Sequence, residues 1–434
     1  MSALANQDDI KMKGWKLSFF TIWTGQAFSL LGSSLVGFAL VWYLTDVTGS
    51  ATVLAIAAML EILPSVFIGP LAGALVDRWN RRLVMLFADS ITALATALLI
   101  YLVWAGTLQI WHIYVLMLAR STAGSFHMPA MLSSTSLMVP EDQLTRVQGL
   151  NQMLRGLINI AAPLLGALLI EFLPLHNVLT VDIGTAVLAI LPLLFIHIPQ
   201  PADDLTRMEG KTSVWKDMSL GFRYVWEWVG LRNIIFLAVV INLVTMPAII
   251  LMPLLVKNEF SGGVVEIASM QSSWAVGFLV GGVLLSTWGG FRRKIMTAIL
   301  GMFGFATGLF IVGISHQIGL QLALAGIFIA GMMNVLINGP AFALLQSVVD
   351  ADIQGRVLAL VISLANAMTP IGLAVAGPLA DKTGVNAIFL FASLVVFTSG
   401  VFTLNNLDIR NIEDDHKDSV QSKERAATRA GVVS

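Results

Sequence analysis

The most regular feature of the chain is an alternation of long apolar runs with short polar segments. A hydrocarbon core about 30 Å thick needs roughly 20 apolar residues per helix, at a rise of about 1.5 Å per residue. Each run is long enough to cross it. The pattern therefore predicts twelve transmembrane helices, at residues 17–44, 51–76, 83–105, 110–131, 148–172, 177–198, 232–256, 265–289, 295–315, 318–347, 357–380 and 384–405.

Composition places the chain in the membrane class. Hydrophobic residues make up 57% and charged residues 12% of the sequence, against about 25% charged residues in soluble domains. We predict an all-α integral membrane protein. The first run exceeds the roughly 7 to 15 residues of a signal-peptide core and lacks a small-residue cleavage site after it, so we expect it to remain as a helix.

Residues that would indicate disulfides, a metal site or a nucleic-acid partner are either absent or not suitably spaced. The absence of cysteine excludes disulfides and thiolate ligands. The six histidines have no metal-ligand spacing, and the net charge of −1 does not indicate a nucleic-acid partner. We therefore predict no metal, no cofactor and no nucleic acid.

Two charged loops indicate an internal repeat. The stretch "GALVDRWNRR", residues 73–82, recurs 209 residues later as "GVLLSTWGGFRRK", residues 282–294. Two more matches follow, "MPA" with "GPA" at an offset of 211 and "RVQGL" with "RVLAL" at 210. An even number of helices returns the chain to its starting side, so we predict two parallel six-helix halves.

The distribution of basic residues gives the orientation. With the N-terminus inside, the inside segments hold 20 Lys and Arg residues and the outside loops hold 2, Lys257 and Lys382. This asymmetry predicts a multi-pass protein with both termini in the cytoplasm. The predicted organisation is a cytoplasmic N-terminus at 1–16, halves at 17–198 and 232–405, a cytoplasmic linker at 199–231 containing an interfacial amphipathic helix at 213–229, and a disordered tail at 406–434.

This architecture, with a charged loop after the second helix of each half, resembles the major facilitator superfamily. The first loop fits the superfamily's pattern of glycine, leucine, acid and bases at Gly73, Leu75, Asp77, Arg78, Arg81 and Arg82. Asn80 stands where glycine is usual, and asparagine also adopts positive φ, so we expect the turn to be kept. "RSTAG", residues 120–124, is similar to the Arg-x-x-x-Gly pattern of proton antiporters.

Finer features resemble a drug-exporting subgroup that contains macrolide efflux proteins and the enterobactin exporter. They lie mainly in the first half and include "GQAFSLLGSSL", "LTDVTGSA", "SFHMPA" and "VPEDQLTRVQGL". The resemblance implies a monomeric, non-enzymatic exporter in a bacterial plasma membrane, which exchanges an amphipathic or cationic small molecule for protons by alternating access. A siderophore or lysophospholipid exporter, or a non-transporting sensor or enzyme on the same fold, are the alternatives. Whether the coupling ion is H⁺ or Na⁺ stays open.

The resemblance also implies that the first charged loop clamps the two halves on the cytoplasmic side. Gly73 would let neighbouring helices approach closely, and Asp77 would receive the partial positive charge of a helix N-terminus. Arg78, Arg81 and Arg82 fit a clamp and a simple topology signal equally well. In the second loop Ser286 replaces the acid, which predicts a weaker latch.

Ionisable residues inside the predicted helices are costly and hence are functional candidates. The first six helices carry Glu61, Asp89, Arg120, His127, Arg155 and Asp182, whereas the last six hold no carboxylate clearly inside the hydrocarbon. We predict proton coupling at Glu61, near the midplane, with Arg120, Asp182 and Asp89 as further candidates. A structural ion pair remains an alternative for Arg120 and Asp182, and we interpret His127 as a polar packing residue.

Substrate binding is predicted from polar and aromatic residues within the same helices. The candidates are Gln26, Glu61, Asn242, Trp274, Asn334 and Asn366. Interhelical hydrogen bonding is the alternative role for each asparagine.

Overall fold

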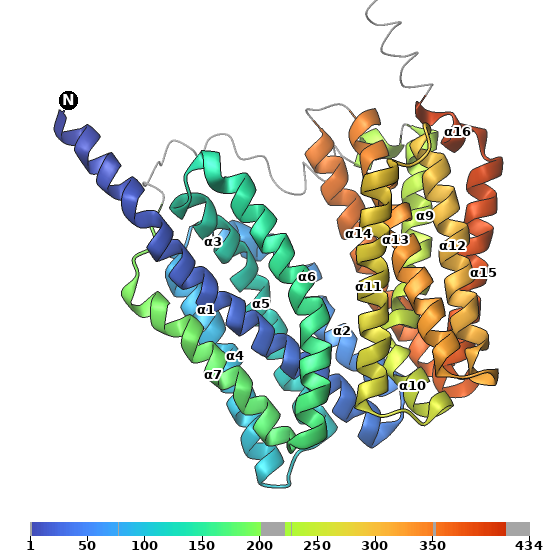
Figure 1. Ribbon diagram of the computed structural model, residues 1–434, viewed down its shortest axis with the longest axis horizontal. Coiled ribbons are helices and arrows are strands. Elements are labelled where there is room, and N and C mark those ends of the chain that lie inside the picture. The colour runs from blue at the N-terminus through green and yellow to red at the C-terminus, as the bar shows by residue number, and fades with distance from the viewer. Residues whose placement is uncertain (1, 77, 201–221, 227, 350–352, 414–434) are drawn as a thin grey trace, which may run out of the picture. The chain divides into compact units, whose positions relative to one another are not determined.

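The computed structural model describes residues 2–76, 78–200, 222–226, 228–349 and 353–413, and Figure 1 shows that helices dominate them. No strand occurs in these ranges. The helices are α1 (Ser2–Thr48), α2 (Ala51–Phe67), α3 (Gly69–Val76), α4 (Arg81–Trp104), α5 (Ile110–Met138), α6 (Glu141–Phe172), α7 (Leu175–Phe195), α9 (Val229–Ile250), α10 (Met252–Phe260), α11 (Val264–Trp288), α12 (Lys294–Ile314), the 3₁₀ turn η2 (Ser315–Gln317), α13 (Leu320–Val348), α14 (Gln354–Thr383), α15 (Val385–Asn405) and α16 (Leu407–Arg410).

Each predicted apolar run lies on one helix or on two consecutive helices. The run 51–76 is divided at Ile68, and the run 232–256 is divided at Leu251. In both cases a proline, Pro70 or Pro253, is the second residue of the helix that follows. Proline has no backbone N–H to continue the hydrogen-bond ladder, so each run bends into two helices there.

The all-α membrane fold is confirmed, but the number of twelve spans is not. Ten helices in the described part of the chain are long and apolar enough to cross a membrane. The exceptions among the predicted runs are α2, which has 17 residues, and α5, which has 29 but carries Arg120, His127 and several hydroxyl side chains. A helix rich in polar side chains needs neighbours that satisfy them within the bundle.

The chain forms two compact units. Unit 1 comprises residues 1–211 and 253–272, and unit 2 comprises residues 212–252 and 273–434. Helices at a spacing of 210 residues have matching lengths: α5 and α13 have 29 residues each, and α7 and α15 have 21 each. This match agrees with a duplicated unit. The predicted boundaries at 198 and 232 stay a prediction.

In unit 1, α1 lies along α7 (Figure 1). Glycines on α1 make this approach possible. A Cβ atom at Gly25 would lie 2.5 Å from the carbonyl oxygen of Leu188, and one at Gly32 would lie 3.2 Å from Cα of Asp182. Small residues let helix backbones come close in a membrane, and here they bring Asp182 against α1.

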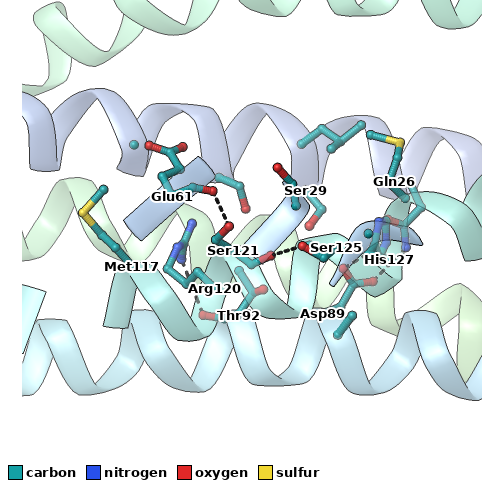
Figure 2. A pocket seen from close by; sticks show the side chains of 18 of the residues that line it. Gln26, Ser29, Glu61, Asp89, Thr92, Met117, Arg120, Ser121, Ser125 and His127 are labelled. Carbon is teal, nitrogen blue, oxygen red and sulfur yellow. Dashed lines mark hydrogen bonds and ion pairs between the residues drawn. The ribbon is translucent and has the colours of Figure 1, made fainter. Parts of the chain in front are cut away.

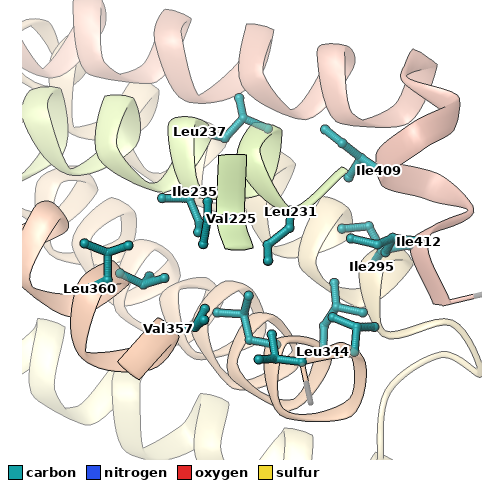
Figure 3. Close-up of a cluster of buried hydrophobic side chains, with 14 of the residues drawn as sticks. Val225, Leu231, Ile235, Leu237, Ile295, Leu344, Val357, Leu360, Ile409 and Ile412 are labelled. Atoms are coloured by element: carbon teal, nitrogen blue, oxygen red, sulfur yellow. The ribbon is translucent and has the colours of Figure 1, made fainter. Parts of the chain in front are cut away.

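In unit 2, a hydrophobic cluster joins α9, α12, α13 and α14 with the segment after α15 (Figure 3). Ile409 and Ile412 of that segment are fully buried in this cluster, and Glu413 forms an ion pair with Lys294 at 3.1 Å. The predicted disorder of the tail is therefore wrong for residues 406–413. Two isoleucines three residues apart supply an apolar face. The prediction of disorder rested on the charged composition of the whole tail and did not take this face into account.

The linker contributes to the same cluster where it is described. Tyr224 and Trp228 pack against the same cluster, in which Val225 is buried. Trp215 and Leu220, the other members of the predicted amphipathic face, lie outside the described residues.

Candidate functional site

A cavity of about 590 Å³ lies within unit 1, between α1, α2, α4 and α5. Figure 2 shows the side chains that line it. Its polar lining includes Gln26, Ser29, Glu61, Asp89, Arg120 and His127. Four of the residues predicted for proton coupling or substrate binding therefore meet at one place: Gln26, Glu61, Asp89 and Arg120.

Asp182 on α7 is the centre of one group of polar contacts, which we name the Asp182 layer. It comprises Asp182, Arg120, Thr96 and Ser33. Arg120 Nη1 lies 2.7 Å from Asp182 Oδ2, Thr96 Oγ1 donates to the same oxygen at 2.6 Å, and Ser33 Oγ donates to Oδ1 at 3.1 Å. Arg120 also donates to Thr96. Because Asp182 is only 1% exposed, this pairing satisfies a carboxylate that would otherwise be very costly to bury.

A second group, the Asp89 layer, comprises Gln26, Asp89 and His127. Gln26 Nε2 donates to Asp89 Oδ2 at 2.8 Å, and His127 Nε2 lies 3.4 Å from Asp89 Oδ1. All three side chains are buried. Within the described residues, Gln26 Oε1 and His127 Nε2 have no hydrogen-bond partner. Buried polar atoms normally have hydrogen-bond partners. This layer can therefore form further hydrogen bonds at these two atoms.

The two layers repeat along three helices with a spacing of seven residues. Residues seven apart share a helix face and lie about 10.5 Å apart along the axis. On each helix, one residue belongs to the Asp89 layer and the residue seven positions away belongs to the Asp182 layer. In that order, the pairs are Gln26 and Ser33 on α1, Asp89 and Thr96 on α4, and His127 and Arg120 on α5.

Glu61 on α2 differs from the other carboxylates of unit 1. It lines the cavity, and Ser121, next to Arg120, donates to its backbone carbonyl. Its carboxylate forms no ion pair or hydrogen bond with any described residue. Arg120, which also lines the cavity, is paired with Asp182.

A second, smaller cavity of about 190 Å³ lies within unit 2, between α9, α11, α12 and α13. Asn242, Trp274 and Asn334 line it, as does Asn338, whose amide donates to Asn334 Oδ1 at 3.0 Å. Its lining contains no charged residue. The fourth C-terminal candidate, Asn366, is exposed on α14 and does not line this cavity.

The charged loop corrects two expectations. A Cβ atom at Gly73 would meet nothing within 4 Å, so helix packing within unit 1 does not require glycine there. Asn80 has φ −68° rather than a positive φ, and its side chain accepts from Leu83 N–H at 3.3 Å. It serves as the N-cap of α4, a position that asparagine favours.

The remaining members of this loop have different surroundings. Arg82 donates to the carbonyls of Leu193 and Leu194 in the last turn of α7, which are free acceptors at a helix end. The side chain of Arg81 is buried, whereas that of Arg78 is exposed. Asp77, the proposed latch residue, lies outside the described residues.

Sequence reasoning missed two members of the layers, Ser33 and Thr96, and gave a third, His127, only a packing role. The signal was present in the spacing, because each lies seven residues from a residue already singled out: Gln26, Asp89 and Arg120 respectively. Each was considered alone, or not at all, and its partners on other helices were unknown.

Comparison with known proteins gives the family. A family model of the Major Facilitator Superfamily matches residues 22–372 and, a second time, 234–434. The chain belongs to this superfamily of membrane transporters, which confirms the resemblance drawn from its loops.

Among its relatives, Macrolide efflux protein A of Streptococcus pyogenes is 32% identical over 403 residues, covering 93% of this chain and 99% of the relative. Multidrug efflux pump Tap of Mycobacterium tuberculosis is 25% identical over 398 residues, covering 88% and 91%. Among solved structures, a bacterial homologue of the iron transporter ferroportin in an inward-facing state has a TM-score of 0.67 at 17% identity, covering 89% and 98%. At that identity the structural similarity supports the fold alone.

Proposed function

We propose that the chain is a secondary active exporter that exchanges an amphipathic or cationic small molecule, of macrolide or multidrug type, for protons by alternating access. The drug-exporting relatives named above support export and this class of cargo. We further propose that it works as a monomer in a bacterial plasma membrane with both termini cytoplasmic, in agreement with the distribution of Lys and Arg.

The observation that carries proton coupling is the unpaired carboxylate of Glu61 within the cavity of unit 1. A charged carboxylate inside an apolar bundle is costly unless a cation neutralises it. Arg120 is engaged by Asp182 at 2.7 Å, so it does not fill this role alone. A proton or a cationic substrate neutralises Glu61, and the two compete for one negative charge. That competition is sufficient for exchange.

The neutral cavity of unit 2 supplies a different kind of recognition. Asn242, Asn334 and Trp274 offer hydrogen-bonding groups among apolar side chains, as in most small-molecule sites. Such a lining suits the hydroxyl, ester and apolar parts of an amphipathic cargo. We assign selection of the cargo to these residues and proton coupling to Glu61. Gln26 and Asp89 line the same cavity as Glu61.

The test is flux through the purified chain in proteoliposomes, with erythromycin and ethidium as probes. An imposed pH gradient drives accumulation of the probes by the wild type. Glu61→Gln keeps the shape of the side chain and mimics its protonated form, so we expect it to lose pH-driven flux and keep downhill exchange. Glu171→Gln, at an exposed carboxylate near the end of α6, serves as the matched control and should behave as the wild type.

Three results contradict the proposal. Wild-type flux that ignores the pH gradient would rule out protons as the coupling ion, and the absence of any flux would favour a sensor or an enzyme on this fold. Glu61→Gln transport at the wild-type rate and pH dependence would remove Glu61 as the carrier and make Asp182 or Asp89 the next candidate.

A further inference from the structure

The Asp89 layer has no role in the exchange described so far. Gln26, Asp89 and His127 come from three different helices, and these residues are 0%, 7% and 8% exposed. The layer faces the same cavity as Glu61. A buried carboxylate beside a buried imidazole is an ionisable pair, and a purely structural contact here would be served as well by neutral groups.

The geometry leaves one position for a proton. Gln26 Nε2 holds Asp89 Oδ2 at 2.8 Å, so Oδ1 is the oxygen that faces His127 Nε2 at 3.4 Å. This separation exceeds the usual N–H···O length of about 2.7 to 3.2 Å, and Nε2 has no hydrogen bond to any described residue. A proton on Nε2 would be donated to Oδ1 and would shorten this contact.

Charge balance over the two layers and Glu61 indicates how many protons the cavity takes. The two layers and Glu61 together contain three carboxylates, Glu61, Asp89 and Asp182, and one guanidinium, Arg120, which leaves two excess negative charges when His127 is neutral. An uncompensated charge inside a membrane bundle is unfavourable. One proton at Glu61 cancels only one of the two.

No other described charge supplies the missing compensation. Facing Asp89, α1 contributes the neutral Gln26, and α5 contributes His127 with Arg120 two turns away. The α7 helix contributes a further acid, Asp182. On α6, Arg155 is exposed, contacts Met128 Sδ at 3.0 Å and does not line the cavity.

We propose that Asp89 and His127 form a second proton-binding site, so that the cavity takes up two protons in each transport cycle. A proton from water bonds to Nε2 of neutral His127, and the resulting imidazolium donates to Asp89 Oδ1 while Gln26 holds Oδ2. Release to the other side of the membrane is the reverse transfer to water. This proposal rests on the exchange function proposed above, and it replaces the packing role first given to His127.

The consequence is a transport cycle that moves net charge. Exchange of two protons for one singly charged cation carries one positive charge across the membrane, whereas exchange of one proton for that cation carries none. A membrane potential of about 60 mV then shifts the equilibrium gradient of the cation about ten-fold for each net charge moved.

The experiment uses the full chain in proteoliposomes, with ethidium as a permanently charged monocation. A potassium diffusion potential is imposed at equal pH on both sides. For the wild type we expect the ethidium gradient to rise about ten-fold per 60 mV. The double variant Asp89→Asn/His127→Gln keeps the shape of Asp89 and replaces the imidazole by a neutral polar side chain, and it should lose this response and still be driven by a pH gradient. His316→Gln, a histidine in the η2 turn of unit 2, should respond as the wild type does.

Each outcome decides the proposal. Wild-type flux driven by a pH gradient but insensitive to the potential overturns the second site and leaves the exchange function intact. A potential response that persists in the double variant also overturns it. Loss of ethidium flux under both gradients in the wild type overturns the exchange function together with this inference. The wild-type measurement needs no variant, so poor folding of the double variant does not protect the proposal.

Discussion

The cavities of the two units differ in charge although the helices around them correspond. The cavity of unit 1 contains ionisable residues, and that of unit 2 is lined by asparagines and apolar side chains. At the offset of 210 residues shared by α5 with α13 and by α7 with α15, Asp89 corresponds to Ile299, Arg120 to Ala330 and Asp182 to Ala392. All three counterparts in unit 2 are buried apolar residues.

This difference teaches that the helix arrangement does not need the charges. Unit 2 packs corresponding helices with isoleucine and alanine at these places. Burying an ion pair requires two charges to leave water, and their attraction repays that cost only when the geometry is good. We therefore attribute the charged layers of unit 1 to the proposed coupling rather than to the stability of the helix bundle.

The largest effect on stability is expected when one partner of the buried ion pair between Arg120 and Asp182 is removed. Asp182→Ala or Arg120→Ala leaves its partner as an uncompensated buried charge, which costs about 3–5 kcal/mol of unfolding free energy. The double variant Arg120→Ala/Asp182→Ala places in unit 1 the residues that unit 2 carries, and we expect it to recover most of that loss. Thermal or denaturant unfolding in detergent measures all three.

A double variant as unstable as the worse single variant would contradict this reading, because it would show that the pair stabilises the unit beyond charge compensation. Transport provides a second check. The double variant should fold and yet transport poorly, since Glu61 would then face a cavity whose charges have changed.

Much of the fold could be predicted from the sequence because membranes restrict the available structures. The apolar runs located the helices, and the matching loops revealed the repeat. Pro70 and Pro253 indicate the helix ends at Ile68 and Leu251. Hydropathy alone did not show them, since proline acts on the backbone ladder rather than on polarity.

The site could be predicted in part. Helical periodicity places Asp89 and Thr96 on one face of α4, and the polarity of Arg120 and Asp182 marked them as candidates. That Asp182 pairs with Arg120 and not with another charge depends on how α4, α5 and α7 pack. Such packing is long-range information that spacing along one helix does not contain.

The next largest effect concerns selection by the neutral cavity. Asn334→Leu or Asn242→Leu removes hydrogen-bonding groups from this lining, and a lost hydrogen bond to a bound ligand is worth about 1–3 kcal/mol, or roughly 5- to 150-fold in affinity. We expect the relative flux of erythromycin and ethidium to change while its dependence on the pH gradient does not. Asn405→Leu, at the exposed end of α15, is the matched control. A shift in pH dependence in either cavity variant would show that coupling is not confined to unit 1.

The two charged loops give a smaller contrast. If Asp77 clamps the outward-open state, Asp77→Asn removes a helix-end interaction of about 0.3–2 kcal/mol and shifts the population toward inward-open by up to about 30-fold. Ser286→Ala, at the matching place in unit 2, should change it much less. Because the chain has no cysteine, labelling of a single Ser136→Cys probe in the last turn of α5 reports the change. Equal effects of the two substitutions would assign the loops to folding rather than gating.

The smallest effect is expected where α4 and α12 start. Arg82 at the start of α4 bonds to the end of α7, whereas Lys294 at the start of α12 bonds to Glu413 beyond α15. Glu413 also accepts the backbone N–H of Lys294 at 3.1 Å. Glu413→Gln keeps an acceptor for that N–H and removes only the ion pair.

Because the side chain of Lys294 is 39% exposed, solvent screens this pair, and its loss should cost no more than about 0.5 kcal/mol. Glu413→Ala removes the cap as well and should cost about 1 kcal/mol. Unfolding measurements at low and high salt separate the two contributions, since salt weakens the ion pair and leaves the cap. A loss well above 1 kcal/mol in Glu413→Gln would mean that the segment after α15 depends on this charge as well as on the burial of Ile409 and Ile412.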